Sequence, residues 1–106
     1  MLNADSLPLK TLKHGSRRDY FDRPTAMSER SEMHVTTLNK KGPAHETHAC
    51  DESEIILVIS GETEMTIEGK DYKGTVGDLY FINSAVQNEV RNASDKPCSY
   101  FVLKWY

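Results

Sequence analysis

Three side chains in the middle of the sequence have the types and the spacing of a metal site. His48 and Cys50 are separated by one residue, and Glu54 follows after three more. Side chains two positions apart on a β-strand point to the same face, so His48 and Cys50 would project together, and Glu54 would share that face if no bulge intervenes. An imidazole, a thiolate and a carboxylate are suitable zinc ligands. The pattern therefore indicates a candidate site for one transition-metal ion.

These residues belong to a longer pattern of two sets joined by a linker from Glu62 to Val76. The first set is Gly42, His48, Cys50, Glu54 and Gly61, with intervals of five, one, three and six residues. The second set is Gly77, Asn83, Ala85, Asn88 and Asn92. Together they resemble the two motifs of the cupin superfamily, G-x5-H-x-H-x3or4-E-x6-G and G-x5-P-x-G-x2-H-x3-N, without a gap in the spacing.

The resemblance implies that positions 48, 50, 54 and 88 are the metal-ligand positions. His48 and Glu54 match the family, whereas Cys50 and Asn88 stand where it has histidines. The implied cofactor is either none or one divalent transition metal, with Zn, Mn, Fe and Ni all compatible with such ligands. Two interpretations stay open. The four residues either form a modified metal site, or they line an ordinary ligand pocket in a barrel that has lost its metal.

The remaining histidines and the second cysteine are candidates of lower rank. His45, three residues before His48, could reach the site mouth if its strand bulges. His34 alternates with Met33 and Val35, and we expect it to be a surface or interface residue. Cys98 is expected to be a buried free cysteine, because a disulfide with Cys50 would require their Cα atoms to approach within about 7 Å.

The elements that must position these residues are short strands. Residues 33–38, 63–68 and 100–105 alternate with period two, and turn signals containing Gly, Pro or Asn-Ser separate them. Ile55 to Ile59 is a continuous apolar run, which predicts a central strand buried on both faces. These patterns predict an all-β sandwich or barrel, and the resemblance implies a double-stranded β-helix of the cupin jelly-roll type over residues 31–106. Residues 1–30 are predicted to form an N-terminal arm that is partly strand and contributes to an interface.

Composition limits the classes of function. The 106 residues allow one core, and the net charge of -3 argues against nucleic-acid binding. No apolar run is long enough for a membrane span or a signal sequence, so the expected location is the cytoplasm with reduced cysteines. Residues 46–78 contain nine acids and two lysines, and the basic side chains of the arm could lie against them.

A finer resemblance concerns Arg17 to Thr25, Glu32 to Asn39 and the ending Tyr100 to Trp105. These segments look like small bacterial cupins related to the two-cupin ureidoglycine aminohydrolase type. The resemblance implies a homodimer of single barrels. Two functions are compatible with it. The first is binding of a small polar metabolite in the barrel with absent or weakened metal binding. The alternative is a metal-dependent enzyme acting on a small ureido, keto-acid or sugar metabolite, and the sequence does not choose between them.

Overall fold

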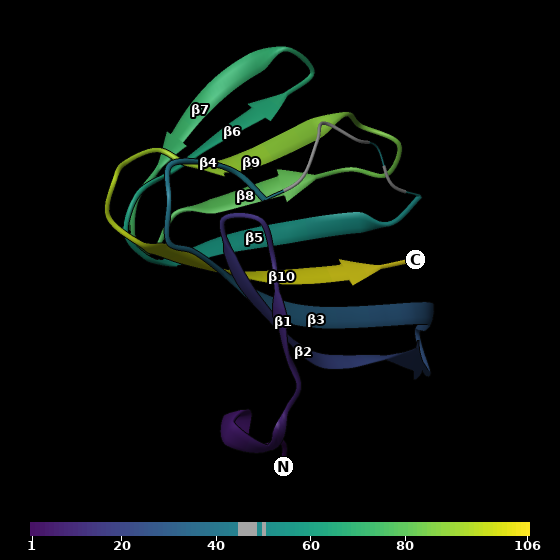
Figure 1. The fold of residues 1–106 in the computed structure, drawn as a ribbon. Coiled ribbons are helices and arrows are strands. Elements are labelled where there is room, and N and C mark those ends of the chain that lie inside the picture. Colours follow the sequence, from purple (N-terminus) through teal and green to yellow (C-terminus); the bar gives the residue numbers. More distant parts are fainter. Residues whose placement is uncertain (45–48, 50) are drawn as a thin grey trace.

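The computed structural model describes residues 1–44, 49 and 51–106. In this part of the chain a short 3-10 helix, η1 (Ala4–Ser6), precedes ten strands (Figure 1). The strands are β1 (Leu9–Thr11), β2 (Gly15–Thr25), β3 (Ser28–Leu38), β4 (Gly42–Pro43), β5 (Ser53–Ser60), β6 (Thr63–Ile67), β7 (Lys70–Gly74), β8 (Leu79–Ile82), β9 (Asn88–Asn92) and β10 (Cys98–Trp105). The prediction of an all-β fold is confirmed.

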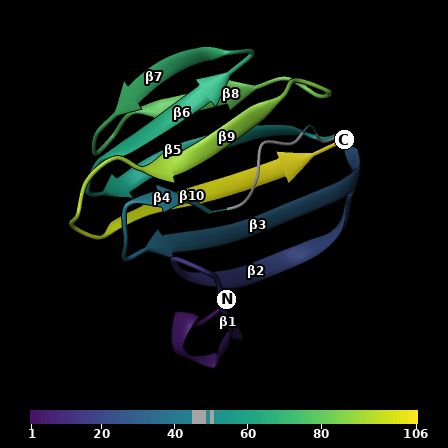
Figure 2. The same ribbon diagram turned by 45° about the horizontal axis from the view of Figure 1, so that its top comes forward.

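The strands form two antiparallel sheets that face each other (Figures 1 and 2). The larger sheet has the order β1-β2-β3-β10-β5-β8, and the smaller has the order β4-β9-β6-β7. The chain passes repeatedly between the sheets, for example from β5 to β6 and from β9 to β10, so strands distant in sequence become neighbours. This arrangement is the jelly-roll barrel that the sequence predicts.

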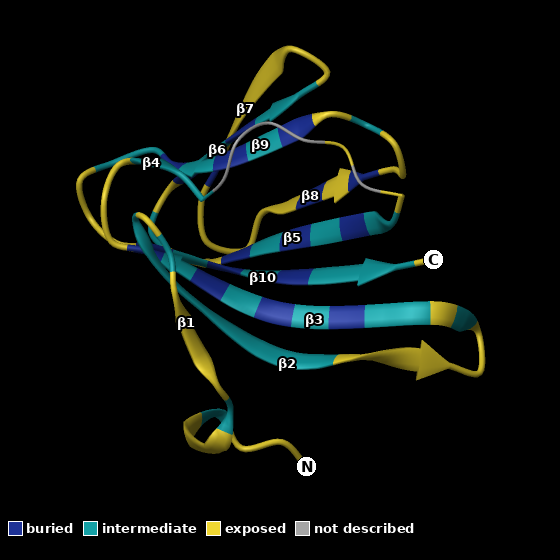
Figure 3. Ribbon diagram, turned by 45° about the vertical axis from the view of Figure 1, so that its right-hand side comes forward, coloured by how far each residue is buried: buried dark blue, intermediate teal, exposed yellow. Residues whose placement is uncertain are grey.

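Burial alternates along the strands that line the barrel, as the stripes of β3 in Figure 3 show. On β3 the even-numbered residues from Glu32 to Leu38 are buried, so the prediction that His34 lies at the surface is wrong. Alternation in the sequence fixes which residues share a face, but not which face is covered. On β5 only Glu54, Ile56 and Val58 are buried, so burial of this strand on both faces is not found within the chain.

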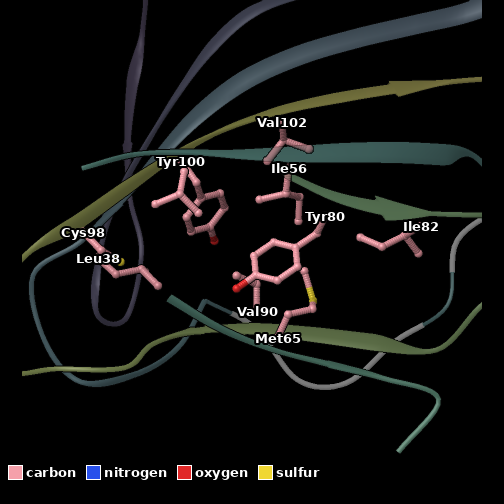
Figure 4. Packing of buried hydrophobic residues seen from close by; sticks show 10 residues of the cluster. Leu38, Ile56, Met65, Tyr80, Ile82, Val90, Cys98, Tyr100 and Val102 are labelled. Atoms are coloured by element: carbon pink, nitrogen blue, oxygen red, sulfur yellow. The ribbon is translucent and has the colours of Figure 1, made fainter. Parts of the chain in front are cut away.

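The core lies between the sheets and consists of ten buried residues. They are Leu38, Ile56, Val58, Met65, Tyr80, Ile82, Val90, Cys98, Tyr100 and Val102. Figure 4 shows the rings of Tyr80 and Tyr100 extending from the larger sheet into this interior. The hydroxyl of Tyr80 is satisfied by Thr63, with 3.0 Å between the two oxygens. Cys98 is a free and fully buried cysteine, as the sequence predicts.

The turn glycines of the sequence pattern have a structural role. Gly42, Gly61 and Gly77 all have positive φ, which L side chains rarely adopt. At Gly61 a Cβ atom would also lie 2.4 Å from the carbonyl oxygen of Pro97. The buried side chain of Asn92 fixes the adjacent turn, because its Nδ2 donates to the carbonyl oxygens of Leu38 and Lys96 at 3.1 and 2.8 Å.

The N-terminal segment joins the larger sheet at its edge. β2 pairs with β3 along its length, and β1 pairs with β2. The proposed division between an arm at 1–30 and a barrel at 31–106 falls inside β3, and the role of the arm in an interface stays a prediction. Arg30 contacts Glu52 at 3.3 Å, which is one contact between this segment and the acidic stretch. Within the described residues no helix is long and apolar enough to cross a membrane.

Candidate functional site

The barrel contains a cavity of about 410 Å³ between the two sheets. Its apolar wall is formed by Leu12, Ala44, Ile56, Val90 and Val102. Its polar and aromatic wall is formed by Arg17, His34, Thr36, Glu54, Asn88, Tyr100 and Lys104. A volume of a few hundred Å³ with a mainly apolar lining and several convergent polar groups is typical of a small-molecule site. The polar groups come from β2, β3, β5, β9 and β10, which only the fold brings together.

Two of the candidate site residues lie in this cavity. Glu54 is 4% exposed and Asn88 is 2% exposed, although β5 and β9 belong to different sheets. The ammonium group of Lys104 lies 4.0 Å from the Glu54 carboxylate. Asn88 donates its Nδ2 to the carbonyl oxygen of Val86 at 3.1 Å, and the residue lines the cavity. The other candidates, His45, His48 and Cys50, lie outside the described residues.

Five polar or aromatic cavity residues were not predicted to be part of the site: Arg17, His34, Thr36, Tyr100 and Lys104. Their strands meet in one antiparallel register, in which β10 lies between β3 and β5. Lys104 is opposite Glu32 on one side and Glu54 on the other. A lysine on the same face as Tyr100 and Val102 was a usable sequence signal, because alternation places the three together once either apolar residue is assigned to the core.

An ion-pair network continues from the cavity wall. Arg17 donates from Nε to Asp19 and from Nη2 to Glu32, both at 2.5 Å, and Lys10 lies 2.7 Å from Asp19. Although burial opposes it, hydrogen bonds from Lys10 and Arg17 lower the pKa of Asp19. The side chain of Arg17 also lines the cavity.

The side chain of His34 is attached to the same network. Its Nδ1 lies 2.8 Å from Oε1 of Glu32, and both residues are buried. The hydrogen bond from His34, with the charge of Arg17, holds the pKa of Glu32 below its usual value. Burial lowers the pKa of His34, and the charges of Arg17 and Lys104 lower it further, against the effect of Glu32. Near neutral pH the pair is therefore a neutral imidazole beside a carboxylate.

Tyr100 supplies a hydroxyl that keeps its proton. Burial raises the pKa of Tyr100 well above its usual value, although a hydrogen bond with Thr36 opposes this. The ring is almost fully buried, and its side chain contributes to the cavity wall. A phenol that stays protonated can donate a hydrogen bond to an oxygen that carries negative charge.

Three of these side chains could geometrically hold a metal ion. The ligand atoms of Asp19, Glu32 and His34 all lie within 4.8 Å of one another. However, Arg17 already binds both carboxylates, and a metal ion would have to displace it. At the positions suggested by the sequence motif, the described residues are Glu54, which faces Lys104, and a neutral amide. Neither described set therefore fits a divalent ion well.

A second, larger cavity of about 630 Å³ is lined by residues of β4, β6, β7 and β9, the strands of the smaller sheet, and by residues that flank these strands. It is lined by residues such as Lys41, Glu64, Lys73 and Arg91 and contains none of the candidate site residues. Arg91 there donates to Glu64 from both Nε and Nη2. We assign the candidate site to the smaller cavity, because Glu54 and Asn88, the described metal-ligand positions of the two motifs, meet there.

Comparison with known families agrees with this barrel and its motifs. The family described as Cupin domain (Cupin_2) matches residues 34–104. The chain belongs to the cupin family. The match begins at His34, within β3, and ends at Lys104, within β10. No curated protein matches the sequence.

Solved cupin structures share the fold at low sequence identity. An RmlC-like cupin from Shewanella frigidimarina superposes with a TM-score of 0.82 at 15% identity, covering 99% of this chain and 88% of the other. KdgF from Halomonas sp. gives a TM-score of 0.81 at 12% identity, with 98% and 89% covered. A sugar phosphate isomerase from Silicibacter pomeroyi gives 0.80 at 11% identity, with 100% and 75% covered. These identities show the fold alone, and they do not confirm the finer resemblance to ureidoglycine aminohydrolase.

Proposed function

We propose that this cupin binds a small anionic metabolite, a sugar acid or sugar phosphate, in the barrel cavity without requiring a metal. The observation that carries the proposal is that Arg17 and Lys104 both line a cavity of about 410 Å³. Glu54 is the one carboxylate of the described lining, and Asp19 and Glu32 bind Arg17 from behind the wall, so an anion would share these two cations with the carboxylates. A guanidinium group recognises carboxylates and phosphates by paired hydrogen bonds.

The rest of the lining supports a ligand that also carries hydroxyl groups. Thr36, Asn88 and Tyr100 provide neutral hydrogen-bonding groups, and Glu54 can accept from a hydroxyl. Val90, Val102 and the other apolar residues would contact the carbon skeleton. The sugar phosphate isomerase of the same fold acts on a compound of this class, which makes sugar phosphates reasonable first probes.

Binding of three probes by titration calorimetry tests the proposal. D-glucuronate and D-glucose 6-phosphate are the anionic probes, and D-glucose is the neutral control. We expect at least one anionic probe to bind and D-glucose to bind at least tenfold more weakly. Lys104→Met should weaken binding of that probe by about tenfold or more, because a charged hydrogen bond is lost. Lys13→Met, an exposed lysine, should leave it unchanged.

Equal affinity for D-glucose, or unchanged binding in Lys104→Met, would contradict the proposal. The same titration is repeated after treatment with EDTA. Retained affinity supports binding without a metal, whereas loss of affinity that Zn²⁺ or Mn²⁺ restores favours the alternative below.

The alternative is a metal-dependent enzyme that acts on a small ureido, keto-acid or sugar metabolite. One observation favours it: Glu54 and Asn88, from the two separate sequence motifs, line the same cavity. A bound metal would polarise a carbonyl group of the substrate. Metal analysis of protein purified without chelator tests this. One equivalent of metal that is lost in Glu54→Gln and retained in Glu62→Gln, an exposed carboxylate, would establish the alternative.

We also propose that the chain forms a homodimer through the outer face of its larger sheet. Two rows of apolar side chains cross this face from β3 through β10 and β5 to β8. One row is Val35, Phe101, Leu57 and Leu79, and the other is Met33, Leu103, Ile55 and Phe81. A continuous apolar face of this kind suits a second copy of the same sheet.

A further inference from the structure

A buried histidine–glutamate pair, His34 and Glu32, lies at the cavity wall. Neither residue belongs to the sequence motifs, and neither supplies the positive charge of the proposed anion site. His34 is 5% exposed and Glu32 is 6% exposed, and the hydrogen bond between them is 2.8 Å long. Burying two titratable groups costs free energy that an apolar pair of similar size would not cost. The next residues along the same register row are Val102 and Ile56, which are apolar. Packing alone therefore does not account for the pair.

The geometry fixes which nitrogen of His34 can act as a base. Glu32 is ionised and can only accept hydrogen bonds, so Nδ1 of His34 must carry the proton. The lone pair of the neutral ring is then on Nε2. This atom has no hydrogen bond to the described residues, and the side chain lines the cavity. Nε2 is thus the nitrogen that a bound ligand would meet.

Two arginines hold Glu32 in position. Arg17 donates to Oε1 at 2.5 Å, and Arg30 donates to Oε2 at 3.3 Å. Oε1 also accepts from His34, so both carboxylate oxygens are engaged. A carboxylate held in this way fixes the orientation and the tautomer of the imidazole, as in other histidine–carboxylate pairs.

The position of His34 places it between two groups that stabilise negative charge. It lies opposite Val102 on β10, and the residues two before and two after Val102 are Tyr100 and Lys104. All three residues of β10 share the inner face of the strand. A ligand lying over Val102 would therefore have His34 beside it, with a hydroxyl donor toward one end and an ammonium group toward the other.

We infer that His34 is a catalytic proton-transfer residue for the anionic sugar of this cavity and that Glu32 is its positioning residue. The inference rests on the proposed function. Nε2 of His34 takes the proton from the carbon next to the sugar carbonyl, and the C–H electron pair forms the C=C bond of an enediolate. The carbonyl oxygen takes the negative charge and accepts hydrogen bonds from Tyr100 or Lys104. Return of the proton to the same carbon completes an exchange. Return to the former carbonyl carbon, with passage of the neighbouring hydroxyl proton to the first oxygen, completes a redox-neutral isomerisation that needs no co-reactant.

In the described part of the chain, the charged groups that face His34 come from four strands. Glu32 lies on its own strand, Arg17 and Asp19 come from β2, Lys104 from β10 and Glu54 from β5. Burial and the two cations lower the pKa of His34 more than Glu32 raises it. The ring is therefore neutral at neutral pH, with Nε2 unprotonated, which is the state that a general base requires.

Deuterium exchange tests the inference in D2O at pD near 7 with EDTA present. The probes are D-glucuronate and D-glucose 6-phosphate, whose C2 hydrogen is next to the carbonyl in the open-chain form, and NMR reports its replacement. The native chain should exchange this hydrogen. His34→Gln should lower the rate by about 100-fold or more while the probe still binds. His14→Gln is the matched control and should exchange at the native rate.

The positioning role of Glu32 is tested by the pH profile. Glu32→Gln should lower the exchange rate and shift the lower limb of the profile, because the partner that sets the tautomer and the basicity of His34 is changed. Glu29→Gln, an exposed glutamate on the same strand, should change neither the rate nor the profile. Nitrogen NMR of the native chain should show His34 with its proton on Nδ1, which requires no variant.

Failure of the proposed function and failure of the inference give different experimental results. If neither anionic probe binds in calorimetry, the proposed function fails, and the inference fails with it. If a probe binds but its C2 hydrogen is not exchanged, or if His34→Gln exchanges it at the native rate, only the inference is overturned. A proton on Nε2 of His34, or exchange that disappears with EDTA, also overturns it.

Discussion

At the scale of single residues, most charged side chains of the described cavity lie outside the two sequence motifs. Arg17 and Lys104 provide the positive charge, and His34 provides a neutral base held by Glu32. Of the motif positions, Glu54 and Asn88 reach the same cavity. Each carboxylate of this site lies near a basic side chain, so the cluster behaves as a network of ion pairs more than as a set of metal ligands.

The lowered pKa of His34 predicts how stability depends on pH. Its folded-state pKa lies below the unfolded value of 6.5, so the unfolded chain binds the proton more readily. The contribution of His34 is therefore fully present above pH 6.5 and is lost as the pH falls through the folded-state pKa. Urea unfolding between pH 7.5 and 5 should show this decline in the free energy of unfolding.

The decline should be smaller in His34→Gln, because glutamine does not titrate. His14→Gln should keep the native dependence, which separates His34 from a general effect of removing a histidine. The range stays above pH 5 so that titration of Glu32 contributes little. If His34→Gln and the native chain lose stability in parallel, His34 is not buried as a neutral group.

At the scale of elements, the turns decide where each strand ends and how it meets its neighbours. Gly61 connects β5 of one sheet with β6 of the other, and it packs against the backbone of Pro97 and Cys98. Gly69 also has positive φ, in the hairpin between β6 and β7, but a Cβ atom there would meet nothing within 4 Å. A comparison of substitutions at Gly61 and Gly69 therefore separates the cost of a left-handed φ from the cost of a steric clash.

Gly61→Ala is expected to lower the free energy of unfolding by about 2–5 kcal/mol, because the left-handed φ and the contact with Pro97 both penalise the methyl group. Gly69→Ala should cost about 1–2 kcal/mol, from its φ alone. Urea denaturation of both variants measures the difference. Equal losses would show that the turn at Gly61 relaxes away from Pro97.

At the scale of the whole molecule, the larger sheet has an inner face that forms the site and an outer face that is apolar. Leu79 and Phe81 on the edge strand β8 are each more than half exposed. Phe81 packs edge to face against Trp105 with 6.0 Å between the ring centroids, which extends the apolar surface toward the end of β10. Burial of this face by a second copy would cover the second side of β5.

Phe81→Lys should convert the dimer into a monomer, because it places a charge within the apolar face of the proposed interface, at its β8 edge. Light scattering during gel filtration measures the mass. Tyr72→Lys is the control: Tyr72 is also an exposed aromatic residue, but it lies on β7 of the smaller sheet, so the dimer should persist. A native chain that is monomeric at micromolar concentration would contradict the proposed homodimer.

The sequence by itself determined the fold class, the turn glycines and two members of the cavity. Period-two alternation and the intervals between Gly42 and Asn92 are local or nearly local signals, and they survive substitution of individual residues. For the same reason the sequence placed Glu54 and Asn88 correctly on inward faces. The motif positions 48 and 50 and the additional candidate His45 lie outside the described residues and stay predictions.

Only the tertiary structure decided which faces of the strands are inside. Alternation in β3 is equally compatible with Val35 or His34 facing the core, and the choice depends on what covers each face. Arg17, His34 and Lys104 lie on three strands from different parts of the chain, so their convergence follows from the pairing order of the sheet. Pairing between distant strands is a non-local property, which is why the polar site in the barrel could not be derived from spacing alone.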